Sequence, residues 1–146
     1  MKLEVQSVVN FVIHIIRLSQ ANLGDKNLKI SNRKLKKFRS SLIDVLRFRY
    51  SYHWFPNKPF KGSGYRCIRV NDRLDPVIGH AAEKCGLSLD ILTAIIPRHL
   101  TIWVDPREVS YRIGDNGCIY VLYKYKINVT QPWKPVEIVE NKTQCL

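Results

Sequence analysis

Apolar residues near the N-terminus recur at intervals of three and four positions, which predicts a helix packed on more than one side. They are Val5, Val8, Val9, Val12, Ile15 and Ile16. A second helical pattern follows Ser31, a favourable N-cap residue, and runs to about Tyr50. Two shorter helices are indicated further on, one after an N-cap at Asp75 with Pro76 in its first turn, the other after an N-cap at Ser88.

From Thr101 the apolar pattern changes to alternation, which is typical of strands with one buried face. Ile102 and Val104 face one way, so Thr101, Trp103 and Asp105 face the other. Two more strand-like runs follow, over residues 109–113 and 118–123, and an Asn-Gly pair between them favours a tight hairpin.

The order of helices first and strands last predicts an α+β fold. We expect a single domain whose N-terminal helices pack against a small, mainly antiparallel sheet that ends in a β-hairpin. The domain should span residues 1–126. Residues 127–146 carry two prolines and little pattern, and we expect them to form a poorly ordered C-terminal tail.

Residues 50–70, between the second helix and the sheet, are rich in aromatic side chains, prolines and glycines. If residues 65–70 form a strand, Ile68 and Val70 face the core and Tyr65 faces away from it. Tyr65 and Trp103 would then both be displayed. They are either edge aromatics half covered by a loop or residues that carry much of the energy of binding a partner.

Charge adds a second candidate surface. The chain of 146 residues has a formal net charge of +12, which favours an acidic partner or nucleic acid. Cations gather between Lys26 and Arg49, on and just before the second helix, with only Asp44 inside that helix to offset them. Either this is a solvated helix face or it binds phosphates or an acidic partner, and the two interpretations are about equally supported. The residues chiefly concerned are Arg33, Lys34, Lys36 and Lys37.

Other site chemistry finds little support in the sequence. No run approaches the roughly 18 apolar residues that a membrane span needs, so we expect no membrane contact. The four cysteines lie far apart, without the spacing of a zinc site, and we expect reduced thiols, no metal and no cofactor. Ser63 and Ser110 have no histidine close by in sequence, so no catalytic group emerges and we expect no enzymatic activity.

Two long motifs resemble the signature boxes of the BTG/Tob antiproliferative (APRO) family, most of all its BTG branch. The first comprises His53-Trp-Phe-Pro-Asn-Lys-Pro59 and Lys61-Gly-Ser-Gly-Tyr-Arg-Cys-Ile-Arg-Val70. The second comprises Leu100-Thr-Ile-Trp-Val-Asp-Pro106 and Glu108-Val-Ser-Tyr-Arg-Ile-Gly114. The resemblance covers about residues 3–125 and is close over both boxes.

The resemblance implies a non-enzymatic adaptor that binds the Caf-type deadenylase subunit of the CCR-NOT complex and promotes mRNA deadenylation. It further implies effects on transcription, translation and proliferation, and a presence in nucleus and cytoplasm. The matching deadenylase-binding residues are Tyr65, Trp103 and Asp105; Asp105 would add a charged hydrogen bond, unless it caps the turn that follows. Contact with cytoplasmic poly(A)-binding protein is implied for the hairpin region around residues 115–123, at Asp115, Asn116 and Tyr120.

The chain departs from the family pattern at three positions. Arg107 stands where an aromatic residue is usual, His99 where an acid is usual, and Asn57 where a glutamate is usual. Arg107 and His99 flank the strand that displays Trp103, so partner affinity and choice are open. The alternative function is a basic RNA-binding module, in which the surface over residues 26–49 holds phosphates and exposed aromatics stack on bases.

Overall fold

The computed structural model describes residues 1–126 of the chain. Its helical elements are α1 (Lys2–Asn22), a 3-10 helix (Lys26–Leu28), α2 (Asn32–Tyr50), α3 (Ser63–Arg66), α4 (Pro76–Lys84) and α5 (Leu89–Ile95). Its strands are β1 (Ile68–Val70), β2 (Leu100–Asp105), β3 (Glu108–Ile113) and β4 (Ile119–Lys124). The tail expected over residues 127–146 lies outside the described residues.

Three helices begin where the sequence predicts them to begin. Ser31, Asp75 and Ser88 are the N-caps of α2, α4 and α5, and each side chain accepts a hydrogen bond from a backbone N–H two or three residues further on. Pro76 occupies the first turn of α4, where its missing N–H costs nothing. Within residues 1–126, no helix has the length and apolar content to cross a bilayer.

The four strands form one antiparallel sheet in the order β1-β2-β3-β4. Ile68 of β1 lies opposite Ile102 of β2, and Trp103 of β2 lies opposite Ser110 of β3. A register shift between Val109 and Ser110 inserts an irregularity into the β3–β4 ladder. The predicted α+β class, with helices before an antiparallel sheet in a single domain, is confirmed.

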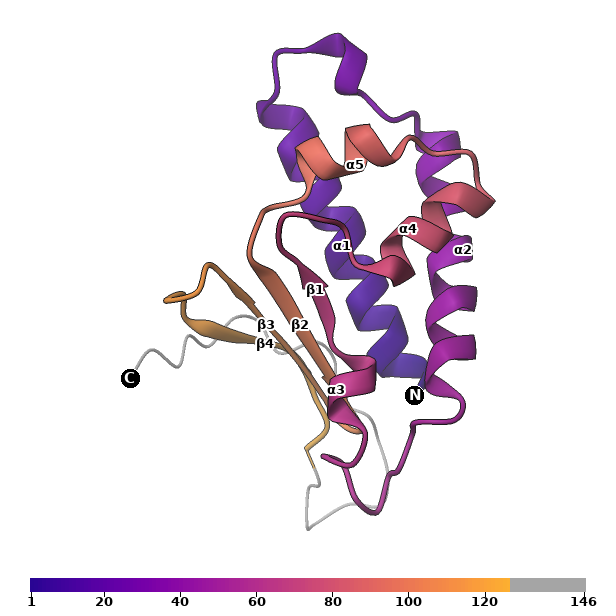
Figure 1. Cartoon of the computed structure of the whole chain (residues 1–146), viewed down its shortest axis with the longest axis vertical. Helices are drawn as coiled ribbons and strands as arrows, with labels where there is room; N and C mark the ends of the chain where they lie inside the picture. The colour runs from indigo at the N-terminus through magenta and orange to yellow at the C-terminus, as the bar shows by residue number, and fades with distance from the viewer. Residues whose placement is uncertain (127–146) are drawn as a thin grey trace.

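The helices cover one face of the sheet. In Figure 1, α1 lies between the sheet and α2, and α4 lies against α2. Phe11 of α1 packs on Tyr111 of β3, with ring centroids 4.2 Å apart. Ile102 and Val104 are fully buried on this side. The opposite side of the sheet, which carries Trp103, is turned away from α1 and is called the outer face below.

The β3–β4 hairpin forms, but not through a two-residue Asn-Gly turn. Its connection runs over residues 114–118, with Gly114 at a φ of 82° and the Gly117 N–H donating to the Gly114 carbonyl at 3.2 Å. A Cβ atom on Gly117 would lie 2.0 Å from the carbonyl oxygen of Ile113. Glycine is therefore required at position 117 by close backbone approach.

Gly117→Ala should lower the free energy of unfolding by about 1–3 kcal/mol, the usual cost of inserting atoms where there is no room. Gly79→Ala is the matched control, because the added Cβ would meet nothing within 4 Å inside helix α4. That variant should be up to about 1 kcal/mol more stable than wild type. Urea denaturation measures both. Equal shifts of the two midpoints would contradict the steric explanation.

Candidate functional site

Trp103 stands on the outer face of the sheet, as strand alternation predicts. Its neighbours Ile102 and Val104 point into the core and are fully buried, whereas Trp103 is half-buried. The guanidinium carbon of Arg112, on the adjacent strand, lies 5.6 Å from the centre of the Trp103 ring. This cation–π contact fixes one side of the indole and leaves part of the ring accessible.

Tyr65 is exposed, but for a different reason from the one predicted. The expected strand over residues 65–70 begins only at Ile68, and Tyr65 lies instead in the helical turn α3. Gly62 takes a positive φ of 73° just before this turn, which reverses the chain. The Tyr65 side chain is 63% exposed, and its ring stacks on His53 with centroids 4.4 Å apart and planes inclined by 11°.

Arg66, next to Tyr65, is the residue that sequence reasoning missed. Its side chain is fully buried and holds together the loop before it and the end of β2. Nε donates to the Val104 carbonyl at 2.7 Å, Nη1 to the carbonyls of His53 and Lys61 at 2.6 and 2.7 Å, and Nη2 to the Pro59 carbonyl at 2.7 Å. All five N–H groups of a guanidinium can be used in such a fork.

Asp105 completes this network. Its Oδ1 accepts from Nη2 of Arg66 at 2.8 Å, and its side chain is 17% exposed against 0% for the arginine. Asp105 therefore neutralises a buried cation within its own domain. Whether it also contacts a partner stays a prediction.

Tyr50 of α2 adds a hydrogen bond to the same network. Its hydroxyl donates to the backbone carbonyl of Arg66 at 2.7 Å, and burial raises the pKa of the phenol far above its ordinary value. The phenol thus remains a protonated donor at any physiological pH. Arg49 adds a hydrogen bond from its Nε to the Tyr65 carbonyl at 3.1 Å. The turn that displays Tyr65 is consequently fixed by hydrogen bonds to α2, to β2 and to the loop that precedes it.

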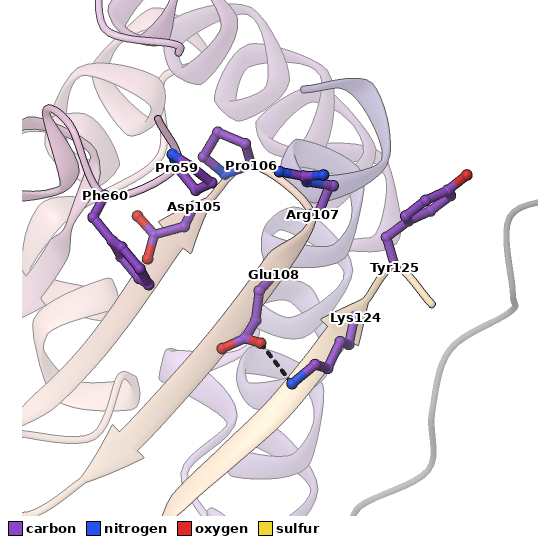
Figure 2. Close-up of a pocket in the computed structure, with 8 residues that line it drawn as sticks. All are labelled: Pro59, Phe60, Asp105, Pro106, Arg107, Glu108, Lys124 and Tyr125. Carbon is purple, nitrogen blue, oxygen red and sulfur yellow. Dashed lines mark ion pairs between the residues drawn. The ribbon is translucent and has the colours of Figure 1, made fainter. Parts of the chain in front are cut away.

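A groove lies where the loop before α3 meets the β2–β3 connection (Figure 2). It has a volume of about 260 Å³. Phe60 stands at its edge with 83% of its side chain exposed, and Glu108 and Lys124, which also line it, form an ion pair at 3.1 Å. The residues that line it are Pro59, Phe60, Asp105, Pro106, Arg107, Glu108, Lys124 and Tyr125.

Two of the three departures from the family pattern lie at special backbone positions. Arg107, after Pro106 in the β2–β3 turn, has a φ of 72°, and His99, just before β2, has a φ of 59°. The Arg107 N–H donates to Oε1 of the buried Glu4 at 2.9 Å, and its guanidinium donates to the Pro56 carbonyl at 3.1 Å. These bonds offset part of the roughly 1–2 kcal/mol that the left-handed conformation costs a residue with a Cβ.

The three residues expected to contact poly(A)-binding protein, Asp115, Asn116 and Tyr120, do not form one cluster. Asp115 and Asn116 are exposed at the hairpin tip, where Nδ1 of His99 lies 3.7 Å from Oδ1 of Asp115. Tyr120 lies in β4 with its ring stacked on Tyr111, centroids 5.2 Å apart. Since Tyr111 packs on α1, the Tyr120 ring belongs to the helix-covered side of the sheet and is half-buried.

The basic residues lie on α2, far from the outer face. Within the described part of the chain, none of the four basic side chains singled out in the sequence forms an ion pair. All four are exposed on α2. In Figure 1, α2 is separated from the sheet by α1. The basic residues are Arg33, Lys34, Lys36 and Lys37.

The cysteines and acids of residues 1–126 form no group of three or more, with or without histidine, that could hold a metal ion. Cys67 and Cys85 carry free thiols, as expected. The expectation of a reduced thiol is wrong for Cys118, which is disulfide-bonded.

Comparison with known proteins identifies the family. The model of the BTG family matches residues 1–123. Protein BTG1 of Homo sapiens is 44% identical over 144 residues, which cover 97% of this chain and 80% of that protein. Protein BTG2 of Rattus norvegicus is 46% identical over 121 residues, covering 83% and 72% respectively. Protein Tob1 of Mus musculus is 40% identical over 123 residues, which cover 84% of this chain but only 31% of that longer protein.

A solved structure shows the same fold. It is a doubly substituted BTG/Tob domain of FOG-3 from C. elegans, which superposes with a TM-score of 0.68, covers 93% of this chain and 91% of its own, and is 24% identical. At that identity the likeness speaks for the fold alone. The resemblance drawn from the two sequence boxes is confirmed by the family match and by the relatives, and the chain belongs to the BTG family.

Proposed function

We propose that this protein is a non-enzymatic adaptor that binds the Caf-type deadenylase subunit of the CCR-NOT complex and thereby promotes mRNA deadenylation. The observation that carries the proposal is the pair of accessible aromatics, Tyr65 in the turn α3 and Trp103 on the outer face of β2, in two segments that Arg66 joins through its bond to the Val104 carbonyl. Both residue types are enriched among the few side chains that dominate the energy of protein interfaces.

Rigidity is the second support. Tyr65 is stacked on His53 and its turn is fixed through Arg66, while Trp103 is fixed by its strand and by Arg112. Side chains that are already ordered lose little conformational entropy when a partner binds, which preserves affinity. Tyr65 and Trp103 are thus both accessible and already ordered, which suits them to contact a partner protein.

The groove beside Asp105 extends the proposed docking surface. It joins apolar side chains, including the exposed Phe60, to a polar rim formed by Arg107 and the Glu108–Lys124 pair. An apolar centre with a polar rim is the common anatomy of protein interfaces. Arg107 replaces the aromatic usual in the family, so this rim is where partner affinity should differ from that of relatives.

The non-enzymatic part of the proposal has a physical reason. Asp105 and Glu108 flank the same turn, but the first is paired with Arg66 and the second with Lys124. Both carboxylates are therefore engaged in ion pairs within the domain. The adaptor would act in nucleus and cytoplasm and slow translation and proliferation. We propose a further contact with cytoplasmic poly(A)-binding protein through Asp115 and Asn116 at the hairpin tip and through Tyr120, which lies apart from them in β4.

Tyr65→Ala tests the proposal. The variant should bind the purified deadenylase subunit at least about tenfold more weakly in calorimetric titration, because a well-exposed interface tyrosine typically contributes more than 1 kcal/mol. Tyr52→Ala is the matched control, since Tyr52 is 79% exposed and precedes the same turn but is not one of the proposed docking residues. If both variants bind as wild type does, the adaptor proposal fails at this surface.

A further inference from the structure

We propose that α2 and α4 together form a binding surface for single-stranded RNA, independent of the deadenylase-docking surface. The first support is the set of unpaired cations on α2. Lys34, Lys37, Ser41, Val45 and Phe48 follow one another at intervals of three or four residues, so they lie along one stripe of the helix. The lysines of this stripe take part in none of the ion pairs within residues 1–126.

The second support is Phe48, at the far end of the same stripe. Its ring is 77% exposed, although an apolar side chain of this size gains roughly 1.5–3 kcal/mol by burial. It borders a groove of about 340 Å³ between α2 and α4, which is lined by Val45, Phe48, His80, Glu83 and Lys84. The stripe faces α4, because the Ser41 hydroxyl donates to the Ala81 carbonyl at 2.9 Å. Phe48 and Lys37 are 11 residues apart on the helix, or about 16 Å. Proteins hold single-stranded nucleic acid by combining such exposed cations, which bind phosphates, with accessible rings on which bases stack.

The chemistry of the surface favours RNA over an acidic protein. Lysine is depleted in protein–protein interfaces, whereas interfaces with nucleic acid are strongly positive. Two acids, Asp44 and Glu83, border the Phe48 end of the stripe and would repel phosphates there. The phosphates are therefore placed at the Lys34 and Lys37 end, and an unpaired base over Phe48.

The proposed RNA-binding surface and the proposed deadenylase-docking surface do not overlap. In Figure 1, α1 stands between α2 and the sheet that carries Trp103. One domain could hold a transcript on its helices while a deadenylase occupies its sheet. The RNA proposal does not rest on the deadenylase proposal, since it uses none of the same residues.

Fluorescence anisotropy with a labelled single-stranded oligonucleotide of about 16 nucleotides tests the inference. The triple variant Lys34→Glu, Lys36→Glu, Lys37→Glu reverses the two lysines of the stripe and their exposed neighbour Lys36. It should bind at least about tenfold more weakly at about 0.1 M salt, and the slope of log affinity against log salt should become shallower by about 2, or about 0.7 for each of the three cations. Phe48→Ala should weaken binding about 5- to 150-fold and leave the salt slope unchanged, because it removes stacking and no charge.

The matched charge control is the triple reversal Lys58→Glu, Arg98→Glu, Lys126→Glu, which changes net charge equally at exposed positions outside α2 and α4. It should retain most of the binding, and thermal melts should show all variants folded. Equal losses in the two triple variants would reduce the effect to net charge and overturn the proposed site. Equal affinity for double-stranded RNA would overturn the stacking role of Phe48, and equal affinity for polyglutamate would overturn RNA as the ligand. Retention of RNA binding by Trp103→Ala would separate the two surfaces.

Discussion

Arg66→Met should lower the free energy of unfolding by about 3–5 kcal/mol, which is the usual cost of removing one partner from a buried ion pair. The arginine serves four backbone carbonyls and the carboxylate of Asp105 from a fully buried position. Methionine fills a similar volume but donates no hydrogen bond, so these acceptors would lose their partner together. The penalty for unmatched buried polar groups is what makes the effect large.

Two further variants divide the effect into its parts. Arg66→Lys keeps the charge but offers one ammonium in place of a planar fork, so it should recover only a part of the lost stability. Asp105→Asn keeps an acceptor and removes a carboxylate that is itself partly exposed, so it should cost less than Arg66→Met. Urea unfolding measures all three, and hydrogen exchange over residues 53–65 should rise most in Arg66→Met. A loss below about 1 kcal/mol for that variant would show that the network adds little to folding.

The helical part of the fold could be read from the sequence because its signals are local. Ser31, Asp75 and Ser88 each bond to a backbone N–H two or three residues away, and so residue type alone marks where α2, α4 and α5 begin. Trp103 lies on the predicted face for a similar reason, since the pleat turns Ile102 and Val104 into the core and leaves Trp103 and Asp105 partly exposed. Thr101, expected on the same face as Trp103, is nevertheless buried.

The hydrogen-bond network of Arg66 could not be predicted in the same way, because its contacts join residues far apart in the sequence. The bonds from Arg66 to Val104 and Asp105 span 38 and 39 residues. One signal was available: Arg66 has the same parity as Ile68 and Val70, so alternation would have turned it toward the core. A buried arginine is rare without an acidic partner. Asp105, at the end of the strand that pairs with β1, was the candidate for that partner. The helical turn at Tyr65 replaced the expected strand because Gly62 reverses the chain there.

Trp103→Ala should weaken binding of the proposed deadenylase partner by at least about 30-fold, which corresponds to the loss of about 2 kcal/mol that defines a dominant interface residue. The indole presents a large accessible surface already fixed by β2 and by the Arg112 guanidinium. Its removal from the outer face should cost the fold only about 1–2 kcal/mol, less than a fully buried aromatic would, because Trp103 is half-buried.

Phe48→Ala is the control that gives this result its meaning. Phe48 is also an exposed aromatic, but it lies on α2, on the other side of α1 from the sheet. Calorimetry with the deadenylase should therefore show full affinity for Phe48→Ala and little for Trp103→Ala, while RNA binding should show the reverse order. Because both residues are large, apolar and accessible, a general loss of surface hydrophobicity would weaken both variants alike. Full deadenylase affinity in a folded Trp103→Ala variant would remove the outer face of the sheet as the docking site.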